Sequence, residues 1–214
     1  MTPYVDIHTH RPTGRHIEPT SAGLHPWDAG KGDAAQAVAL FGKVQAAGEI
    51  GLDFACGVPR RMQEEALCVQ LRAAEEIGKP VVLHCVRAFE PMMKILDGYA
   101  LRAVIFHGFI GSVQQARQAV GKGYFLSFGD RSLRSPKTVQ ALREVPPENI
   151  FLETDEGEPA IEEIYARAAD VRGIEVDELK EAILANYERI FEHDEQQLVR
   201  AHRTAFGQRE VRNA

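Results

Sequence analysis

Short runs of apolar residues, rich in Val, Ile, Leu and Phe, alternate with stretches of helical period along most of the chain. We expect strands over residues 4–8, 21–25, 48–52, 81–84, 103–107, 124–128 and 150–153. Strands that alternate with amphipathic helices are typical of an α/β fold built on a largely parallel sheet.

The stretches between the predicted strands carry recognisable helix boundaries. Asp33 is a candidate N-cap for a helix that runs to residues 46–47. Ser112 and Gln115 form a capping box before a helix that ends at Gly121. Further helices are expected over 61–77, from 135–136 onwards, over 158–172 and over 177–191. In the helix over 61–77, the apolar face consists of Met62, Ala66, Val69, Ala73 and Ile77.

Residues able to bind a metal or to activate water recur at the carboxyl-terminal ends of at least five predicted strands. An open parallel sheet concentrates its chemistry at one switch point, whereas a barrel gathers residues from many strands onto one rim. We therefore expect a TIM-type β/α barrel. Only about fourteen residues separate His10 from His25, too few for a helix and another strand. The barrel is thus expected to be shortened to about seven strands, with one βα unit missing near the N-terminus and no helix longer than one turn between these histidines.

Four histidines lie where predicted strands end. Asp6, His8 and His10 alternate along the first predicted strand and so share one face. Two imidazoles one pleat apart offer a two-point grip on a divalent metal. His84 and His107 each follow an apolar run as its first polar residue. A single histidine in such a place is more often a core residue, but the repetition predicts metal binding.

Two carboxylates complete the candidate metal site. Glu49 stands beside two glycines, and its two oxygens could bridge two metals, which one imidazole cannot do. Asp155 follows the last predicted strand and could bind metal, take a proton from metal-bound water, or both. A divalent metal lowers the pKa of bound water from about 15.7 toward 7, and two metals roughly 3.5–4 Å apart stabilise both the attacking and the leaving oxygen of a phosphodiester. We therefore predict catalytic roles for Asp155 and Glu49 and two divalent metal ions, which could be Zn, Mg, Mn, Ni or Fe because nitrogen and oxygen ligands accept all of them.

Four further residues are candidates for substrate binding. Arg87, three residues past His84, could hold a substrate phosphate or form a salt bridge within the rim. His25 could bind substrate or stabilise charge in the transition state, and Trp27 could stack on a base or only wall the pocket. Asp53 ends the strand of Glu49 and is grouped with them.

Length and charge narrow the function classes. The 214 residues fit one domain over 1–191, followed by a charged C-terminal tail over 192–214. A net charge of −6 does not suit a broad duplex-DNA binder, but it suits an enzyme that meets a few phosphates through metals and one or two arginines. Three cysteines without a C-x-x-C motif, no leader and no membrane-length apolar run predict a cytoplasmic protein without membrane contact.

The order and spacing of these motifs resemble the TatD family of metal-dependent hydrolases, within the amidohydrolase-like barrel superfamily. The resemblance is collinear from Asp6 to about Phe191. It rests on Asp6-x-His8-x-His10, Gly23-Leu24-His25-Pro26-Trp27, Gly48-Glu49-Ile50-Gly51-Leu52-Asp53, Gln63-x-Glu65, Pro80-Val81-Val82-Leu83-His84, His107-Gly108-Phe109, Leu152-Glu153-Thr154-Asp155 and Asn186-x-x-Arg189-Ile190-Phe191.

The resemblance implies one metal bound by His8, His10 and Asp155, a second bound by His84 and His107, and Glu49 as the bridge. Members of the family are typically divalent-metal DNases, often exonucleases on single strands. Some have been linked to the removal of D-amino acids from mischarged tRNA. DNA ends or single strands are therefore the expected substrate.

Three departures from the family pattern leave the substrate open. Most relatives place a whole α-β-α passage between the first histidines and the Gly-x-His-Pro motif; its absence exposes a flank, so self-association is plausible. Residues 108–111 read Gly-Phe-Ile-Gly where members often have Cys-Phe-Ser-Gly, and residues 155–159 read Asp-Glu-Gly-Glu-Pro in place of Asp-x-Pro. The alternatives are a metal-dependent amide, lactone or aminoacyl-ester hydrolase acting on a small molecule, and a non-catalytic metal-binding protein.

Overall fold

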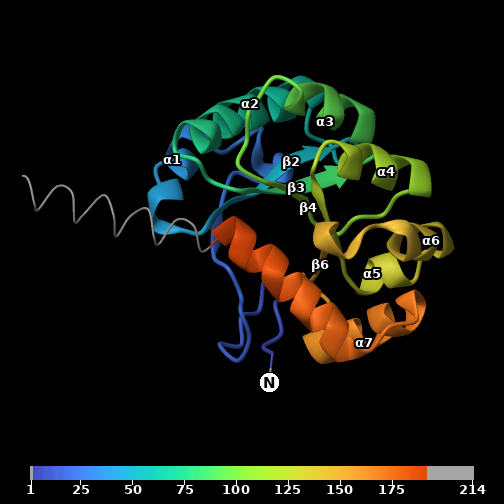
Figure 1. Ribbon diagram of the computed structural model, residues 1–214. Coiled ribbons are helices and arrows are strands. Elements are labelled where there is room, and N and C mark those ends of the chain that lie inside the picture. The colour runs from blue at the N-terminus through green and yellow to red at the C-terminus, as the bar shows by residue number, and fades with distance from the viewer. Residues whose placement is uncertain (1, 192–214) are drawn as a thin grey trace, which may run out of the picture.

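Six parallel strands form the centre of the protein and follow one another across the sheet in sequence order. The computed structural model describes residues 2–191, and Figure 1 shows the helices arranged around this sheet. The strands are β1 (Ser21–Ala22), β2 (Ala46–Asp53), β3 (Val81–Val86), β4 (Val104–Phe106), β5 (Phe125–Phe128) and β6 (Ile150–Leu152). The α-helices are α1 (Ala34–Val38), α2 (Arg60–Glu76), α3 (Phe89–Leu96), α4 (Val113–Gly121), α5 (Asp130–Leu133), α6 (Pro136–Glu144), α7 (Ile161–Arg172) and a last helix over 176–191. Short 3-10 helices are η1 (Pro26–Asp28), η2 (Phe41–Lys43) and η3 (Pro147–Asn149). The predicted α/β class with a parallel sheet is confirmed.

The N-terminal segment, residues 4–10, joins the two edges of this sheet. On one side the amide of Ile7 donates to the carbonyl of Leu152 at the end of β6 (3.1 Å). On the other side the amide of Asp6 donates to the carbonyl of Ile17 (2.9 Å), in the stretch that leads into β1. The segment is extended but forms only isolated bridges, so the predicted strand over 4–8 is not a regular strand. Backbone pairing therefore runs from β1 to β6 and back through residues 4–10 to the stretch before β1.

Most predicted elements occur, with shifted boundaries. No helix lies between His10 and His25, as predicted. Asp33 caps α1, and the capping box of Ser112 and Gln115 is present. The helix expected from 33 to 46–47 was too long, because residues 46 and 47 are buried and begin β2. The strand expected over 21–25 ends at residue 22, and His25 instead precedes η1. Helices α3 and α5 were not predicted.

Helix α2 turns a partly polar side toward the sheet. Its buried positions include Gln63 and Gln70, whereas Met62, Val69 and Ile77 of the expected apolar face are 38%, 48% and 52% exposed. Each buried glutamine binds backbone near the rim, at the end of β2 for Gln63 and in the loop before η1 for Gln70. The Gln63 carbonyl accepts from the amide of residue 53 (2.7 Å), and the Gln70 carbonyl accepts from the amide of residue 24 (2.6 Å). These contacts set the rotation of the helix, because a buried amide left without partners would cost ~1–3 kcal/mol.

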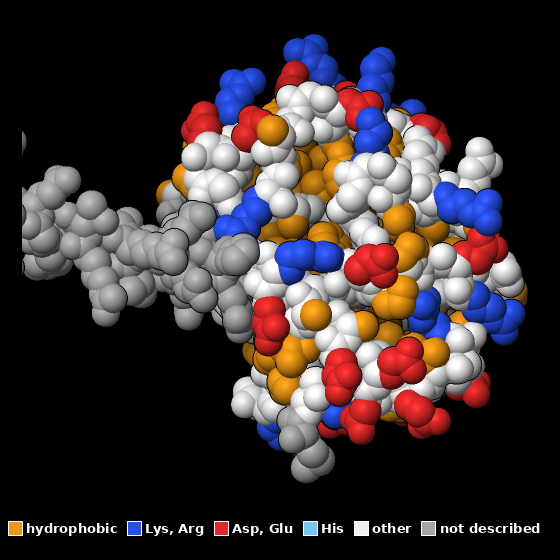
Figure 2. Space-filling model, viewed as in Figure 1, with side chains coloured by type: hydrophobic (Ala, Val, Ile, Leu, Met, Phe, Trp, Pro, Cys, Tyr) orange, Lys and Arg blue, Asp and Glu red, His pale blue; other side chains and the backbone are white. Residues whose placement is uncertain are grey.

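The surface carries charges of both signs. On the face shown in Figure 2, the Lys and Arg side chains are scattered and do not merge into one patch. This face therefore lacks the continuous basic surface that duplex-DNA binding requires. Among the described residues, no helix is both long enough and apolar enough to span a bilayer. The predicted tail over 192–214 lies outside the described residues.

Gly51 is the glycine on which the close approach of β2 and β3 depends. Its φ is +151°, and a Cβ at this position would overlap the backbone carbonyl of His84. We expect Gly51→Ala to lower the free energy of unfolding by about 3 kcal/mol, because the overlap is with backbone and cannot be relieved by a side chain. Urea denaturation measures the effect.

Gly57→Ala is the matched control, because a Cβ at Gly57 would have nothing within 4 Å. Equal midpoints and slopes for the two variants would contradict the close contact between these strands.

Candidate metal centre

Glu49 lies at the centre of a cluster of histidines at the carboxyl-terminal rim of the sheet. Its Oε1 atom is 2.8 Å from Nε2 of His8 and 2.9 Å from Nε2 of His10. Its Oε2 atom is 2.7 Å from Nε2 of His107 and 3.4 Å from Nδ1 of His84. The two oxygens of one carboxylate thus face two different pairs of imidazoles.

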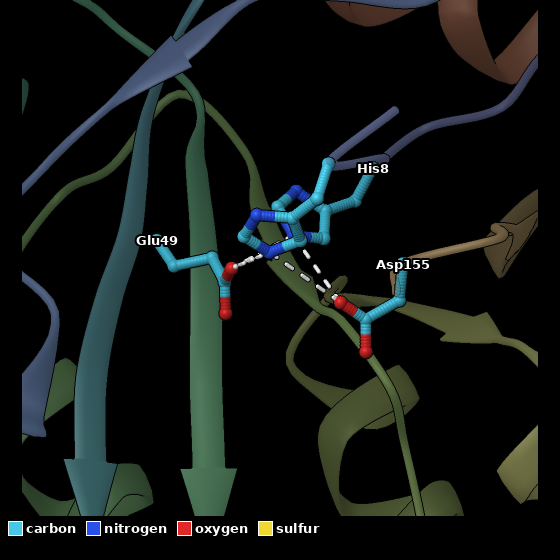
Figure 3. Close-up of side chains that lie close together, drawn as sticks. His8, Glu49 and Asp155 are labelled. Carbon is cyan, nitrogen blue, oxygen red and sulfur yellow. Dashed lines mark hydrogen bonds and ion pairs between the residues drawn. The ribbon is translucent and has the colours of Figure 1, made fainter. Parts of the chain in front are cut away.

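Asp155 faces the first of these pairs from the opposite side (Figure 3). Its Oδ1 atom is 3.5 Å from Nε2 of His10 and 3.9 Å from Nε2 of His8. The backbone holds it there: the amide of Asp155 donates to the carbonyl of His8 (3.0 Å), and the amide of His10 donates to the carbonyl of Asp155 (3.1 Å). Asp155 has a positive φ of 52°, a conformation that aspartate tolerates better than most residues.

The structure brings all six predicted metal ligands together. Three groups of donor atoms each lie within 4.8 Å of one another: His8, His10, Glu49 and Asp155; His25, Glu49 and His84; and His107, Glu153 and Asp155. Imidazole nitrogens and carboxylate oxygens are the donor set that divalent transition metals accept. His84 and His107 do not point into separate cores, since Nδ1 of His84 lies 3.2 Å from Nε2 of His107. The residues therefore fit a metal centre in chemistry and in placement.

Opposite charges stabilise one another within the cluster. Burial alone would raise the pKa of Glu49, but hydrogen bonds from His107, His8 and His84 hold that pKa far below its usual range. Burial likewise disfavours charge on His107, yet Glu153 and Glu49 raise its pKa to about 10. The pKa of Asp155 is raised, first by burial and then by the charge of Glu153. Such a mutually compensated set of donors is typical of a functional site.

Two further carboxylates, those of Glu153 and Asp53, lie next to the histidines His107 and His84. Glu153 is completely buried, and its Oε1 atom lies 3.4 Å from Nδ1 of His107 and accepts from the amide of Gly108 (2.6 Å). Asp53, only 5% exposed, has its Oδ2 atom 3.4 Å from Nε2 of His84 and accepts from Nε1 of Trp27 (2.7 Å). Carboxylates in this position orient ligating histidines. For Asp53, which we predicted to bind substrate, these contacts favour a positioning role.

A cavity of about 390 Å³ opens above the cluster and includes His25 and Trp27 in its walls. Trp27 is 57% exposed although its indole nitrogen donates to Asp53, so much of the side chain remains open to the cavity and to solvent. Burial and the neighbouring His84 lower the pKa of His25 to about 4, which keeps its imidazole neutral at pH 7. Arg87 lies apart, in an adjacent cavity that it shares with His107. Its substrate contact stays a prediction.

Arg131 is one of the cavity residues that we did not predict from the sequence, and Asp28 is another. Arg131 belongs to α5 and lines the cavity together with Glu156, one of the extra acidic residues expected near the site. A signal was present, because Arg131 follows the apolar run of β5 at the same rim to which β4 delivers His107.

Comparisons with known proteins agree with this geometry. Residues 15–192 match the family described as TatD related DNase. The chain is 31% identical over 201 residues to the 3′-5′ ssDNA/RNA exonuclease TatD of Citrobacter rodentium, covering 80% of this chain and 76% of that protein. The crystal structure of YjjV, a TatD homologue from Escherichia coli, is similar with a TM-score of 0.73 at 30% identity, covering 82% of this chain and 77% of that one.

An uncharacterized amidohydrolase from Saccharomyces cerevisiae shares the fold alone, with a TM-score of 0.71 at 14% identity over 83% of this chain and 82% of that one. The chain spans only 46% to 64% of the length of several other curated relatives.

Glu153 should set the metal affinity of the cluster through His107. We expect Glu153→Gln to weaken metal binding by about 10- to 100-fold, because the neutral amide no longer orients the imidazole. Competition with a coloured chelator measures the affinity. Glu163→Gln on α7, an exposed position, is the control and should bind metal as the unmodified protein does. Unchanged affinity in Glu153→Gln would show that His107 needs no such partner.

Proposed function

The chain belongs to the TatD-related DNase family, and we propose that it is a two-metal hydrolase that cleaves phosphodiester bonds at the ends of single-stranded nucleic acid. The observation that carries this proposal is the orientation of the Glu49 carboxylate. One oxygen faces His8 and His10, and the other faces His84 and His107. A carboxylate that serves two sets of ligands suits a bridge between two cations.

In this proposal His8, His10 and Asp155 would hold one cation, His84 and His107 would hold the other, and Glu49 would contact both. The cations would activate water and stabilise the charge that develops on the attacking and leaving oxygens. Asp155 would accept the proton of the attacking water, because its carboxylate lines the open cavity and its pKa is raised, whereas the pKa of Glu49 is held far below its usual range. His25 lies 3.7 Å from Oε2 of Glu49, on the cavity side, where a neutral imidazole can donate a hydrogen bond to substrate.

The cavity supports a single strand as the substrate. Trp27 offers an exposed ring against which a base can stack, and base–aromatic stacking is worth ~1–3 kcal/mol. The printed name of the Citrobacter rodentium relative, an exonuclease on ssDNA and RNA, supports the same class. We also infer that the fold is a barrel of about seven strands that lacks one βα unit. Residues 11–20 contain no helix, and they pair directly with the N-terminal segment.

A metal-dependent hydrolase of amides, lactones or aminoacyl esters is the second candidate. Two features favour it: Glu156 adds negative charge to the cavity, and Ile110 is 51% exposed in the segment over 108–111. The charge of Glu156 would repel a polyanion, and the apolar side chain of Ile110 would give it no hydrogen bond. A small, partly apolar substrate could bind beside both residues. The two candidates differ in the bond cleaved, so one metal-loaded preparation distinguishes them.

We expect metal-stripped protein, reloaded with Mg, Mn or Zn, to shorten end-labelled single-stranded DNA from one end. Asp155→Asn should lower the rate by at least ~100-fold, because the amide cannot accept the proton. Asp170→Asn, an exposed position on α7, is the control for contaminating nuclease and should retain full activity.

Metal content is measured on each sample. Protein that holds two metals but leaves DNA intact would contradict the nuclease proposal. Hydrolysis of an amide or ester panel by that sample would favour the second candidate.

A further inference from the structure

We propose that Arg131 is a substrate-anchoring residue that binds an anionic group next to the bond being cleaved. This inference rests on the proposed hydrolase function of the same cavity. Arg131 lines two adjoining cavities, one with Glu49 and Trp27 in its walls and one with Gly108 and Glu153. Among the described lining residues of both, it is the one lysine or arginine.

The backbone of Arg131 is fixed by the residues on either side. The carboxylate of Asp130 accepts from Arg134 and from Arg167, each at 2.7 Å. The hydroxyl of Ser132 is buried and donates to the carbonyl of Phe109 (2.8 Å), on the loop after β4. The backbone of Arg131 is therefore fixed at the rim. This reduces the conformational entropy that is lost when the side chain binds a ligand.

The guanidinium itself is not engaged by these contacts. Within residues 2–191, no ion pair joins Arg131 to a carboxylate, although Asp155 and Glu156 line the same cavity. Asp130, its neighbour, is instead paired with two other arginines. A fork of five donors whose backbone is held beside a reactive centre, and which forms no ion pair with the described residues, suits a phosphate or carboxylate of the ligand.

Arg131 lies apart from the cluster, because its guanidinium is beyond ion-pair distance of the carboxylates of Glu49 and Asp155. The proposal assigns to Arg131 a second anion of the substrate, next to the group that meets the metal ligands. In a nucleic acid that group is the neighbouring phosphate, and in a small ester or amide it is a carboxylate. Both share the chemistry of a planar or tetrahedral oxyanion that accepts two hydrogen bonds.

Calorimetric titration of the metal-loaded protein tests the proposal with two probes, the dinucleotide d(pTpT) and succinate. Arg131→Gln should weaken the binding of one probe by at least about tenfold, the effect expected for a lost charge-assisted hydrogen bond. Arg131→Lys should restore part of it. Arg117→Gln on α4, where an exposed arginine pairs with Glu144, removes the same charge elsewhere and should bind as the unmodified protein does.

A loss confined to d(pTpT) supports Arg131 as a phosphate anchor, and a loss confined to succinate supports it as a carboxylate anchor and contradicts the neighbouring phosphate as its ligand. Equal affinities of Arg131→Gln and the unmodified protein for both probes would overturn the proposal. So would an equal loss in Arg117→Gln, or an unmodified protein that holds two metals and binds neither probe. The proposed nuclease function can fail separately, since d(pTpT) binding requires no cleavage.

Discussion

The pairing of the N-terminal segment with the end of β6 is the constraint on which the rest of the structure depends. Ile7, His8 and His10 form backbone hydrogen bonds with Leu152 and Asp155, which lie far along the chain from them. The Asp6 carboxylate reinforces the pairing, because it accepts from both the amide (2.9 Å) and the hydroxyl (2.7 Å) of Thr154. This pairing joins the edges of the sheet and places His8 and His10 beside Asp155. Without this pairing, His8 and His10 would not be held next to Asp155 in the candidate metal centre.

The connection between the N-terminal segment and β1 is short, so few residues are available to bring the edges of the sheet together. Only residues 11–20 separate the N-terminal segment from β1, and they contain no helix. Thr13 and Gly14 instead donate to the carboxylate of Glu18, which turns the chain back within a few residues. The carbonyl of residue 20 then accepts from the amides of residues 45 and 46, at the start of β2. A compact loop thus performs the connection for which a helix and a strand would otherwise be expected.

The convergence of six side chains could be predicted because each has a local signature. Every one follows or interrupts an apolar run, and parallel strands deliver their ends to one rim. What could not be predicted depends on contacts between loops that are distant in sequence. Gln63 and Gln70 look like surface residues of a helix, and only the folded loops show that they are buried partners of the backbone. Arg131 had a sequence signal in its place after the apolar run of β5, but the fixing of its backbone depends on the contact of Asp130 with Arg167 on α7.

The floor and the walls of the cavity are built from different parts of the fold. Glu49 and His84 lie on strands whose positions are set by the buried core, whereas Trp27, Arg131 and Glu156 lie on short connections at the rim. Connections tolerate substitution and insertion far better than core strands do. The departures from the family pattern over 108–111 and 155–159 fall on such connections, while all six predicted ligands are present. Such a division allows the wall residues to change which substrate enters without displacing the groups beneath it.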